Sequence, residues 1–249
     1  MDSFDYKKFY NEVGQMNGWD FSRLSVIVED ALWNFWSEVS SRCKAGDIVL
    51  DIGTGGGEAL LRMADAAQLL IGIDHSEAMI QTANRNRERS GRANIRFLPM
   101  EASELHFPER FFQVISCRHS EFNAAEVARV LADGGVFLTQ QVGESDKRNL
   151  AQAFGRGQSG NAKRGTLMER YAAELKEAGF RQIDCRQYDA VEYYATAEDL
   201  IFLLKHTPII PGFGQTESDF QTLHRFIAEH QTPKGIQTNA DRFMIIAYK

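Results

Sequence analysis

The sequence predicts an α/β fold built on a doubly wound, mostly parallel sheet of seven strands. Short apolar runs without polar alternation are separated by helical segments, which is typical of a parallel sheet buried on both faces with right-handed crossovers. A glycine-rich turn at residues 53–57 follows the first of these runs. The chain of 249 residues is 43% hydrophobic and 25% charged, which fits one soluble domain with a single hydrophobic core.

Residues 1–45 are expected to form N-terminal helices that cover the main unit. In the first, over residues 3–15, aromatic and apolar side chains recur at helical spacing. In the second, apolar residues recur at intervals of three and four, which gives the helix one apolar face. Its members are Leu24, Ile27, Val28, Ala31, Leu32, Phe35 and Val39.

Residues 46–191 are predicted to form the core of alternating strands and helices. The expected strands are 48–52, 69–74, 94–98, 111–116, 134–142 and 180–191. The expected helices are 57–67, 76–90, 123–131 and 166–178, the last ending at Gly179. Residues 144–165 lose all periodicity and collect Gly155, Gly157 and Gly160, so a mobile loop is expected there.

Residues 192–240 are predicted to form a helical insertion before the last strand, which occupies 241–249. Two helical stretches, 196–206 and 217–229, lie within this insertion. A simple hairpin would need only a few residues between its strands. The insertion is therefore interpreted as a lid or a substrate wall over one end of the sheet.

Charge and cysteine content exclude several classes of partner and site. With 28 basic and 34 acidic residues, the net charge of −6 makes a nucleic-acid partner unlikely. The three cysteines are far apart, so neither a disulfide framework nor a cysteine metal site is expected, and no metal is predicted. No apolar stretch is long enough to span a membrane and the N-terminus has no signal-peptide core, so we expect a cytoplasmic protein. A monomer or a homodimer is expected.

The segment Val49–Glu58, VLDIGTGGGE, lies where the first strand turns into the first helix. Glycine allows the backbone to pass close under a ligand, and the helix N-terminus behind it presents free amide donors. A dinucleotide fingerprint that begins at Gly53 would require a third glycine at position 58, where this chain has Glu58. A nicotinamide oxidoreductase is therefore the least favoured interpretation.

The pattern Asp51, Gly53, Gly55, Gly57 resembles the first motif of class I S-adenosylmethionine-dependent methyltransferases, of the methyltransferase type 11-like kind. The resemblance continues in order through four further segments, GIDHSEAMI, FLPMEASELHF, FFQVIS and EVARVLADGGVFL. It covers about residues 49–142 and implies a Rossmann-like fold with S-adenosylmethionine as cofactor. The chain lacks an Asn-Pro-Pro-Tyr tetrapeptide after the fourth strand, which disfavours the amide and adenine N-methyltransferases.

The resemblance implies specific roles for the residues of the glycine loop. Asp51 would accept a hydrogen bond, directly or through water, from the ammonium group of the ligand. The loop residues Gly53, Thr54, Gly55 and Gly57 would let the methionine part lie against the backbone.

The resemblance also implies contacts to the nucleoside. Asp74 would accept from both ribose hydroxyls, because one carboxylate can accept two parallel hydrogen bonds; a helix N-cap is the alternative role. His75 and Met79 would pack on the adenine. Glu101 would accept from the adenine amino group beside the backbone of Ala102, although a loop carboxylate is often simply solvated.

Two residues follow the fourth strand, where doubly wound folds present ligand-facing side chains. The main chain of Arg118 would approach the methionine amine of the ligand. His119 is the candidate general base, with a structural histidine as an equal alternative. Tyr193 and Tyr194, with Trp19 and Phe21, are candidate pocket aromatics.

The function predicted on these grounds is in-line methyl transfer from S-adenosylmethionine to a small-molecule acceptor, where alignment and water exclusion supply most of the rate. One alternative is an RNA or protein methyltransferase that uses the basic loop over 144–165 as an anion clamp. Another is a binding protein that holds the cofactor without transferring its methyl group. The cations of that loop are Lys147, Arg148, Arg156, Lys163 and Arg164.

Overall fold

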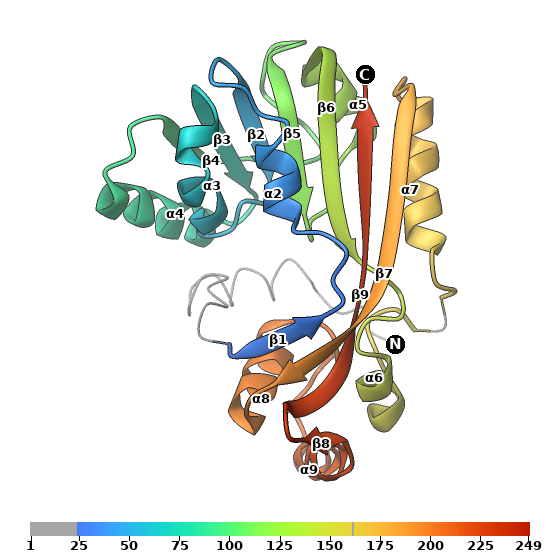
Figure 1. The fold of residues 1–249 in the computed structure, drawn as a ribbon. Coiled ribbons are helices and arrows are strands. Elements are labelled where there is room, and N and C mark those ends of the chain that lie inside the picture. The colour runs from blue at the N-terminus through green and yellow to red at the C-terminus, as the bar shows by residue number, and fades with distance from the viewer. Residues whose placement is uncertain (1–23, 161) are drawn as a thin grey trace.

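The structure, a computed structural model, describes residues 24–160 and 162–249. The expected helix over residues 3–15 and the aromatic residues Trp19 and Phe21 lie outside these ranges. Within them, one mixed sheet runs through the whole molecule, with helices against both of its faces (Figure 1).

Over the described residues the sheet has nine strands, ordered β1-β7-β9-β6-β5-β2-β3-β4, with β8 paired to β9. The strands are β1 Val26–Glu29, β2 Ile48–Ile52, β3 Leu69–Asp74, β4 Ile95–Pro99, β5 Phe112–Arg118, β6 Leu131–Val142, β7 Gln182–Tyr194, β8 Gln231–Thr232 and β9 Gly235–Tyr248. Strands β2 to β6 are parallel, whereas β9, β7 and β1 pair antiparallel. The doubly wound α/β prediction is confirmed. The predicted count of seven is exceeded by two, because β1 and β8 add to the sheet.

Helices cover both faces because the strand residues alternate between two apolar clusters. On one face Leu50 and Ile52 pack with helices α5 and α7, and on the other Val49 packs with α2, α3 and α4. The helices are α2 Phe35–Ser40, α3 Glu58–Arg62, α4 Glu77–Ser90, α5 Ala124–Val130, α6 Arg148–Phe154, α7 Thr166–Glu177, α8 Ala197–His206 and α9 Glu217–His230. A short 3₁₀ turn, Ala64–Ala66, follows α3.

The predicted helix over 24–39 is wrong. Its first part is strand β1, which pairs with β7 in the register Val26↔Tyr194 to Glu29↔Val191. A run of three β-branched residues, 26–28, favours a strand once an edge is available to pair with. The helix begins only after Asn34, whose side chain accepts from the backbone N–H of Ser37 at 3.0 Å, and it is the short α2.

Strands β7 and β9 are paired over thirteen residues, from Gln182↔Tyr248 to Tyr194↔Ile236. The last strand therefore begins at Gly235, earlier than the expected residue 241. Figure 1 shows the extended ends of β7 and β9 continuing past the parallel strands, with β1, α8 and α9 around them. The two predicted helical stretches of the insertion correspond to α8 and α9.

A separate apolar core holds this outer part together. The expected loop over 144–165 is not irregular throughout, because it contains helix α6, whose Leu150 is fully buried in this core. The buried members are Leu150, Tyr194, Leu200, Leu203, Leu204, Ile210, Leu223, Phe226 and Ile236. None of the helices in the described ranges is both long and apolar enough to cross a membrane.

Candidate functional site

The turn after β2 has the backbone that the glycine spacing predicts. Gly53, Gly55 and Gly57 have φ angles of 74°, 56° and 78°, in the left-handed region that favours glycine. The N–H groups of Gly53 and Thr54 both donate to the carbonyl of Ile73 at 2.9 Å, which fixes the turn on β3. A Cβ atom on Gly57 would collide with the Phe97 ring. The glycine loop is therefore a close-packed bend in front of helix α3 rather than a flexible linker.

Asp74 ends β3 and holds the glycine loop. Its Oδ2 accepts from the backbone N–H of Gly55 at 3.0 Å, and its Oδ1 accepts from the N–H of Ser76 at 2.9 Å. Ser76, not Asp74, is the N-cap of α4. Each oxygen of an ionised carboxylate can accept more than one hydrogen bond, so both retain capacity for a further donor. Burial is the main cause that raises the pKa of Asp74, and the two backbone donors oppose it.

Asp51 lies one strand away, at the carboxyl end of β2, with only 2% of its surface exposed. The Ser116 hydroxyl donates to its Oδ1 at 2.7 Å. Burial raises the pKa of Asp51 to about 7, and the nearby Asp74 acts in the same direction. A buried carboxyl with this pKa favours a cationic ligand, because a positive charge would stabilise its ionised form.

The structure brings two of the remaining residues assigned to the nucleoside close to Asp74. The Nδ1 atom of His75 lies 3.6 Å from Asp74 Oδ1, and Glu101, which is exposed after β4, acts electrostatically on Asp74. Met79 is buried in the first turn of α4, and Ala102 packs against the apolar core. The contacts of all four residues with a ligand remain a prediction.

Arg118 is the last residue of β5, and its side chain is exposed. Burial is nevertheless the largest cause that lowers its pKa, followed by the like charge of Arg242. His119 follows with a φ of 57° and shares this situation, because burial lowers its pKa well below the usual value although the residue is exposed.

The protonation state of His119 follows from its hydrogen bonds. The indole N–H of Trp33 donates to Oε1 of Gln140 at 2.8 Å, which turns the Gln140 amide nitrogen toward His119. That nitrogen lies 3.2 Å from Nε2 of His119, so Nε2 accepts and the ring proton of the neutral form is on Nδ1. The neighbouring cations Arg118, Arg242 and Lys147 also disfavour a charged imidazole.

Comparison with known proteins identifies a domain within the chain. A model described as a methyltransferase domain matches residues 49–135, which contain the glycine loop, Asp51 and Asp74. Residues 49–135 therefore carry a methyltransferase domain.

Similar proteins share this methyltransferase domain over part of their length. An uncharacterised methyltransferase of Bacillus subtilis, YcgJ, is 35% identical over 106 residues, which is 40% of this chain and 42% of the relative. The 27-O-demethylrifamycin SV methyltransferase of Amycolatopsis mediterranei is 28% identical over 62% of each chain. The chain thus spans less than two thirds of these curated relatives. The crystal structure of YcgJ has the same fold, with a TM-score of 0.63, 19% identity, and coverage of 86% of this chain and 96% of that one.

Several residues around the methyltransferase site were not predicted from the sequence. Ser116 contacts Asp51 from the neighbouring strand, and strand alternation places it on the same face as Arg118. That alternation was a usable signal once β5 was recognised. Trp33 and Gln140, in contrast, are 107 residues apart and carry no motif, so only the tertiary structure reveals their contact.

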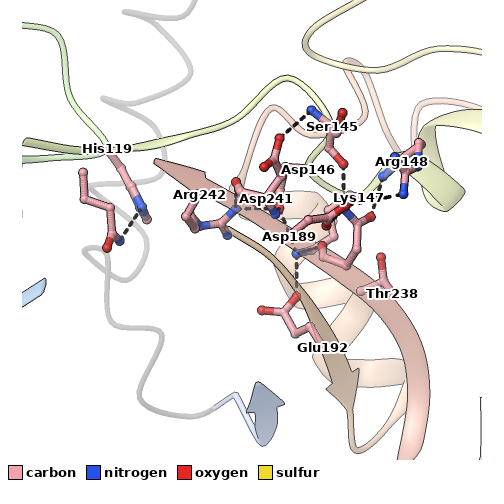
Figure 2. Close-up of polar contacts among 12 residues, drawn as sticks. His119, Ser145, Asp146, Lys147, Arg148, Asp189, Glu192, Thr238, Asp241 and Arg242 are labelled. Atoms are coloured by element: carbon pink, nitrogen blue, oxygen red, sulfur yellow. Dashed lines mark hydrogen bonds and ion pairs between the residues drawn. The ribbon is translucent and has the colours of Figure 1, made fainter. Parts of the chain in front are cut away.

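Four of the five cations of the basic loop pair with carboxylates. Lys147 is 1% exposed and its Nζ lies 2.5 Å from Glu192 Oε2. Arg164 pairs with Asp241 and Arg156 with Asp219. Figure 2 shows the buried ionic groups of this region, with Arg242 between His119 and Lys147. We call Asp146, Lys147, Glu192, Asp241 and Arg242 the junction cluster, because they join β6, β7 and β9 where the outer core begins.

Proposed function

We propose that this protein transfers a methyl group from S-adenosylmethionine to a small-molecule acceptor by in-line displacement. The observation that carries the proposal is the Asp74 carboxylate, which is fixed by two backbone donors directly beside the glycine loop. The ligand presents two ribose hydroxyls, an ammonium group and a sulfonium. These groups suit a bend that carries two buried carboxyls, Asp74 and Asp51, and no buried cation of its own among the described loop residues 51–58.

In the proposed reaction, the residues at the glycine loop bind and align the cofactor and take no part in proton transfer. When bound, the cofactor supplies a methyl group on a positively charged sulfur. Asp74 holds the ribose, Asp51 accepts from the ammonium group, and the glycine loop lets the intervening atoms lie against the backbone. This fixed alignment, together with exclusion of water, is sufficient to accelerate an in-line displacement.

A small-molecule acceptor is favoured over a nucleic acid or a protein by two observations. The relative from Amycolatopsis is named for methylation of a rifamycin, which is a small molecule. Three of the five cations that an RNA would need, Lys147, Arg156 and Arg164, pair with buried carboxylates. A protein that holds the cofactor without transferring its methyl group is the remaining alternative. Such a protein would form no methylated product from S-adenosylmethionine that carries a labelled methyl group.

Two measurements test the proposal. Calorimetry with S-adenosylmethionine, S-adenosylhomocysteine and NAD is expected to give micromolar binding of the first two, on the order of −8 kcal/mol, and none of NAD. Transfer of a labelled methyl group to a library of small acceptors then tests catalysis. A salt-dependent transfer to RNA, or binding of NAD with no binding of S-adenosylhomocysteine, would contradict the proposal.

Cofactor affinity is expected to rise with pH because of Asp51. Its pKa of about 7 means that the carboxyl is largely protonated at pH 5.5, and only the ionised form attracts an ammonium group. Affinity for S-adenosylhomocysteine should increase between pH 5.5 and 7, by up to about tenfold per pH unit. The pKa is raised in the fold, so the stability of the free protein falls as pH rises from 3.8 toward 7. Calorimetry at four pH values measures the first effect.

The matched control for the pH effect is Asp51→Asn. This variant should bind more weakly at pH 7 and show a flat pH profile over the same range. A wild-type affinity that does not change with pH would show that Asp51 does not meet the ammonium group.

Replacing His119 by alanine is expected to lower kcat by about 100-fold or more if this histidine takes a proton from the acceptor. Its neutral form is ready to accept at Nε2, although the acceptor must first displace the Gln140 amide from that atom. The Kd for S-adenosylhomocysteine should change less than threefold. An unchanged rate on an identified acceptor would eliminate the base role and leave His119 a structural residue.

A further inference from the structure

The charged side chains of the site lie in one row on one face of the sheet. Asp51, Ser116 and Arg118 share the face that carries Val49 and Val114, because side chains alternate along a strand. The row continues across the sheet, since Arg118 pairs with Gln140 in the next strand.

Beyond Gln140, the same row reaches the outer strands. Arg242 lies on this face two residues before Met244, the partner of Gln140, and it pairs with Tyr188 of β7. Asp51 and Tyr188 both act electrostatically on Arg118. Arg118 therefore lies between the carboxyl assigned to the cofactor and the outer strands, where an acceptor would approach the methyl group.

Among the residues that the structure describes, Arg118 differs from the other cations of this region in having no ionic partner. Lys147 pairs with Glu192, and Arg242 pairs with Asp146. Over residues 24–160 and 162–249, the Arg118 guanidinium makes no hydrogen bond or ion pair. A guanidinium that is crowded by protein and by like charge favours an anion, and its planar fork matches a carboxylate.

The side chains near Arg118 suit a small organic molecule. The rings of Trp33 and Tyr188 lie 4.5 Å apart at an angle of 58°, and both side chains are half-buried. The neutral His119 ring adds a hydrogen-bond donor at Nδ1 and no charge. These groups supply apolar contact and a donor, and Arg118 supplies a positive charge that has no ionic partner among the described residues.

We infer that the methyl acceptor is a small organic acid whose carboxylate is bound by the Arg118 side chain. This inference rests on the proposed function, because it places the acid next to a bound cofactor. The same guanidinium could bind the carboxylate of the cofactor instead, and the experiment below separates the two sources.

Benzoate and phenylacetate, each compared with its amide, test this site on protein saturated with S-adenosylhomocysteine. We expect each acid to bind the wild type at least tenfold more tightly than its amide. Arg118→Gln should remove this preference, and Arg118→Lys should keep part of it. The control is Arg62→Gln, because Arg62 is exposed in the same electrostatic neighbourhood and should leave the preference unchanged.

Three outcomes would overturn the inference. Equal binding of acids and amides by the wild type, or a preference that persists in Arg118→Gln, would show that no such carboxylate site exists. A tenfold loss of affinity for S-adenosylhomocysteine in Arg118→Gln, with unchanged affinity for 5′-methylthioadenosine, would assign Arg118 to the cofactor carboxylate. Absence of S-adenosylhomocysteine binding by the wild type would contradict the proposed function itself, and binding without acid preference would contradict only this site.

Discussion

Asp74→Ala is expected to weaken the binding of S-adenosylhomocysteine by about 100-fold, since a hydrogen bond to a charged group contributes roughly 1.5–3 kcal/mol. The variant loses both acceptors for the ribose hydroxyls. It also releases the N–H of Gly55, which Asp74 Oδ2 holds at 3.0 Å, so the glycine loop loses one of its contacts with β3. Titration calorimetry measures the affinity, and thermal unfolding of the variant confirms that it folds.

The matched control for Asp74→Ala is Glu77→Ala, three residues further on. Glu77 is an exposed carboxylate in the first turn of α4. Removing it changes the charge of the region equally and should alter affinity less than threefold. Asp74→Asn should fall between the two, because its side chain keeps one acceptor oxygen. Affinity in Asp74→Ala within threefold of the wild type would refute the ribose assignment.

The sequence was sufficient for features that depend on local pattern. The strands over 48–52 and 69–74 were predicted with their observed bounds, because continuous apolar runs between turn residues have few other interpretations. Glycine in the first turn allows positive φ, and Gly53, Gly55 and Gly57 have it. Asp51 and Asp74 could be placed together because parallel strands present their carboxyl ends at one edge of the sheet.

The errors occurred where distant partners decide the local structure. Residues 26–28 have an apolar pattern compatible with a helix, and only the edge of β7, more than 160 residues later, makes them a strand. The first half of β9, from Gly235, has a polar sequence that does not look like a buried strand. It pairs with β7, and the side chains of Lys147 and Asn149 donate hydrogen bonds to its backbone. No periodicity within these segments reveals that environment.

The junction cluster is a further case in which the sequence pattern does not reveal distant partners, and it leads to a prediction about stability. Lys147 was grouped with exposed loop cations, yet its ammonium group is buried between Glu192 Oε2 at 2.5 Å and the Asn239 carbonyl at 3.0 Å. Tyr194 donates a further hydrogen bond to the same Glu192 oxygen at 2.9 Å. The cluster thus links the end of β6 to both long strands.

Lys147→Met is expected to lower the free energy of unfolding by about 3–5 kcal/mol, because removing one partner of a buried ion pair leaves the other charge unpaired. Methionine retains the unbranched stem at a φ of 51°, so the change tests the charge rather than the backbone. The control is Arg148→Met. Arg148 is 57% exposed and lies 3.5 Å from Asp189, and an exposed pair of this kind contributes at most about 1 kcal/mol.

Denaturant unfolding of four proteins, the wild type, Lys147→Met, Glu192→Gln and the double variant, separates the pair from its surroundings. The double variant should be destabilised by less than the sum of the two single variants, because each removes the partner that makes the other costly. Strict additivity would mean that the two charges are not coupled. A loss below 1 kcal/mol in Lys147→Met, similar to that in Arg148→Met, would mean that water reaches Glu192 and that the junction is not a sealed ionic contact.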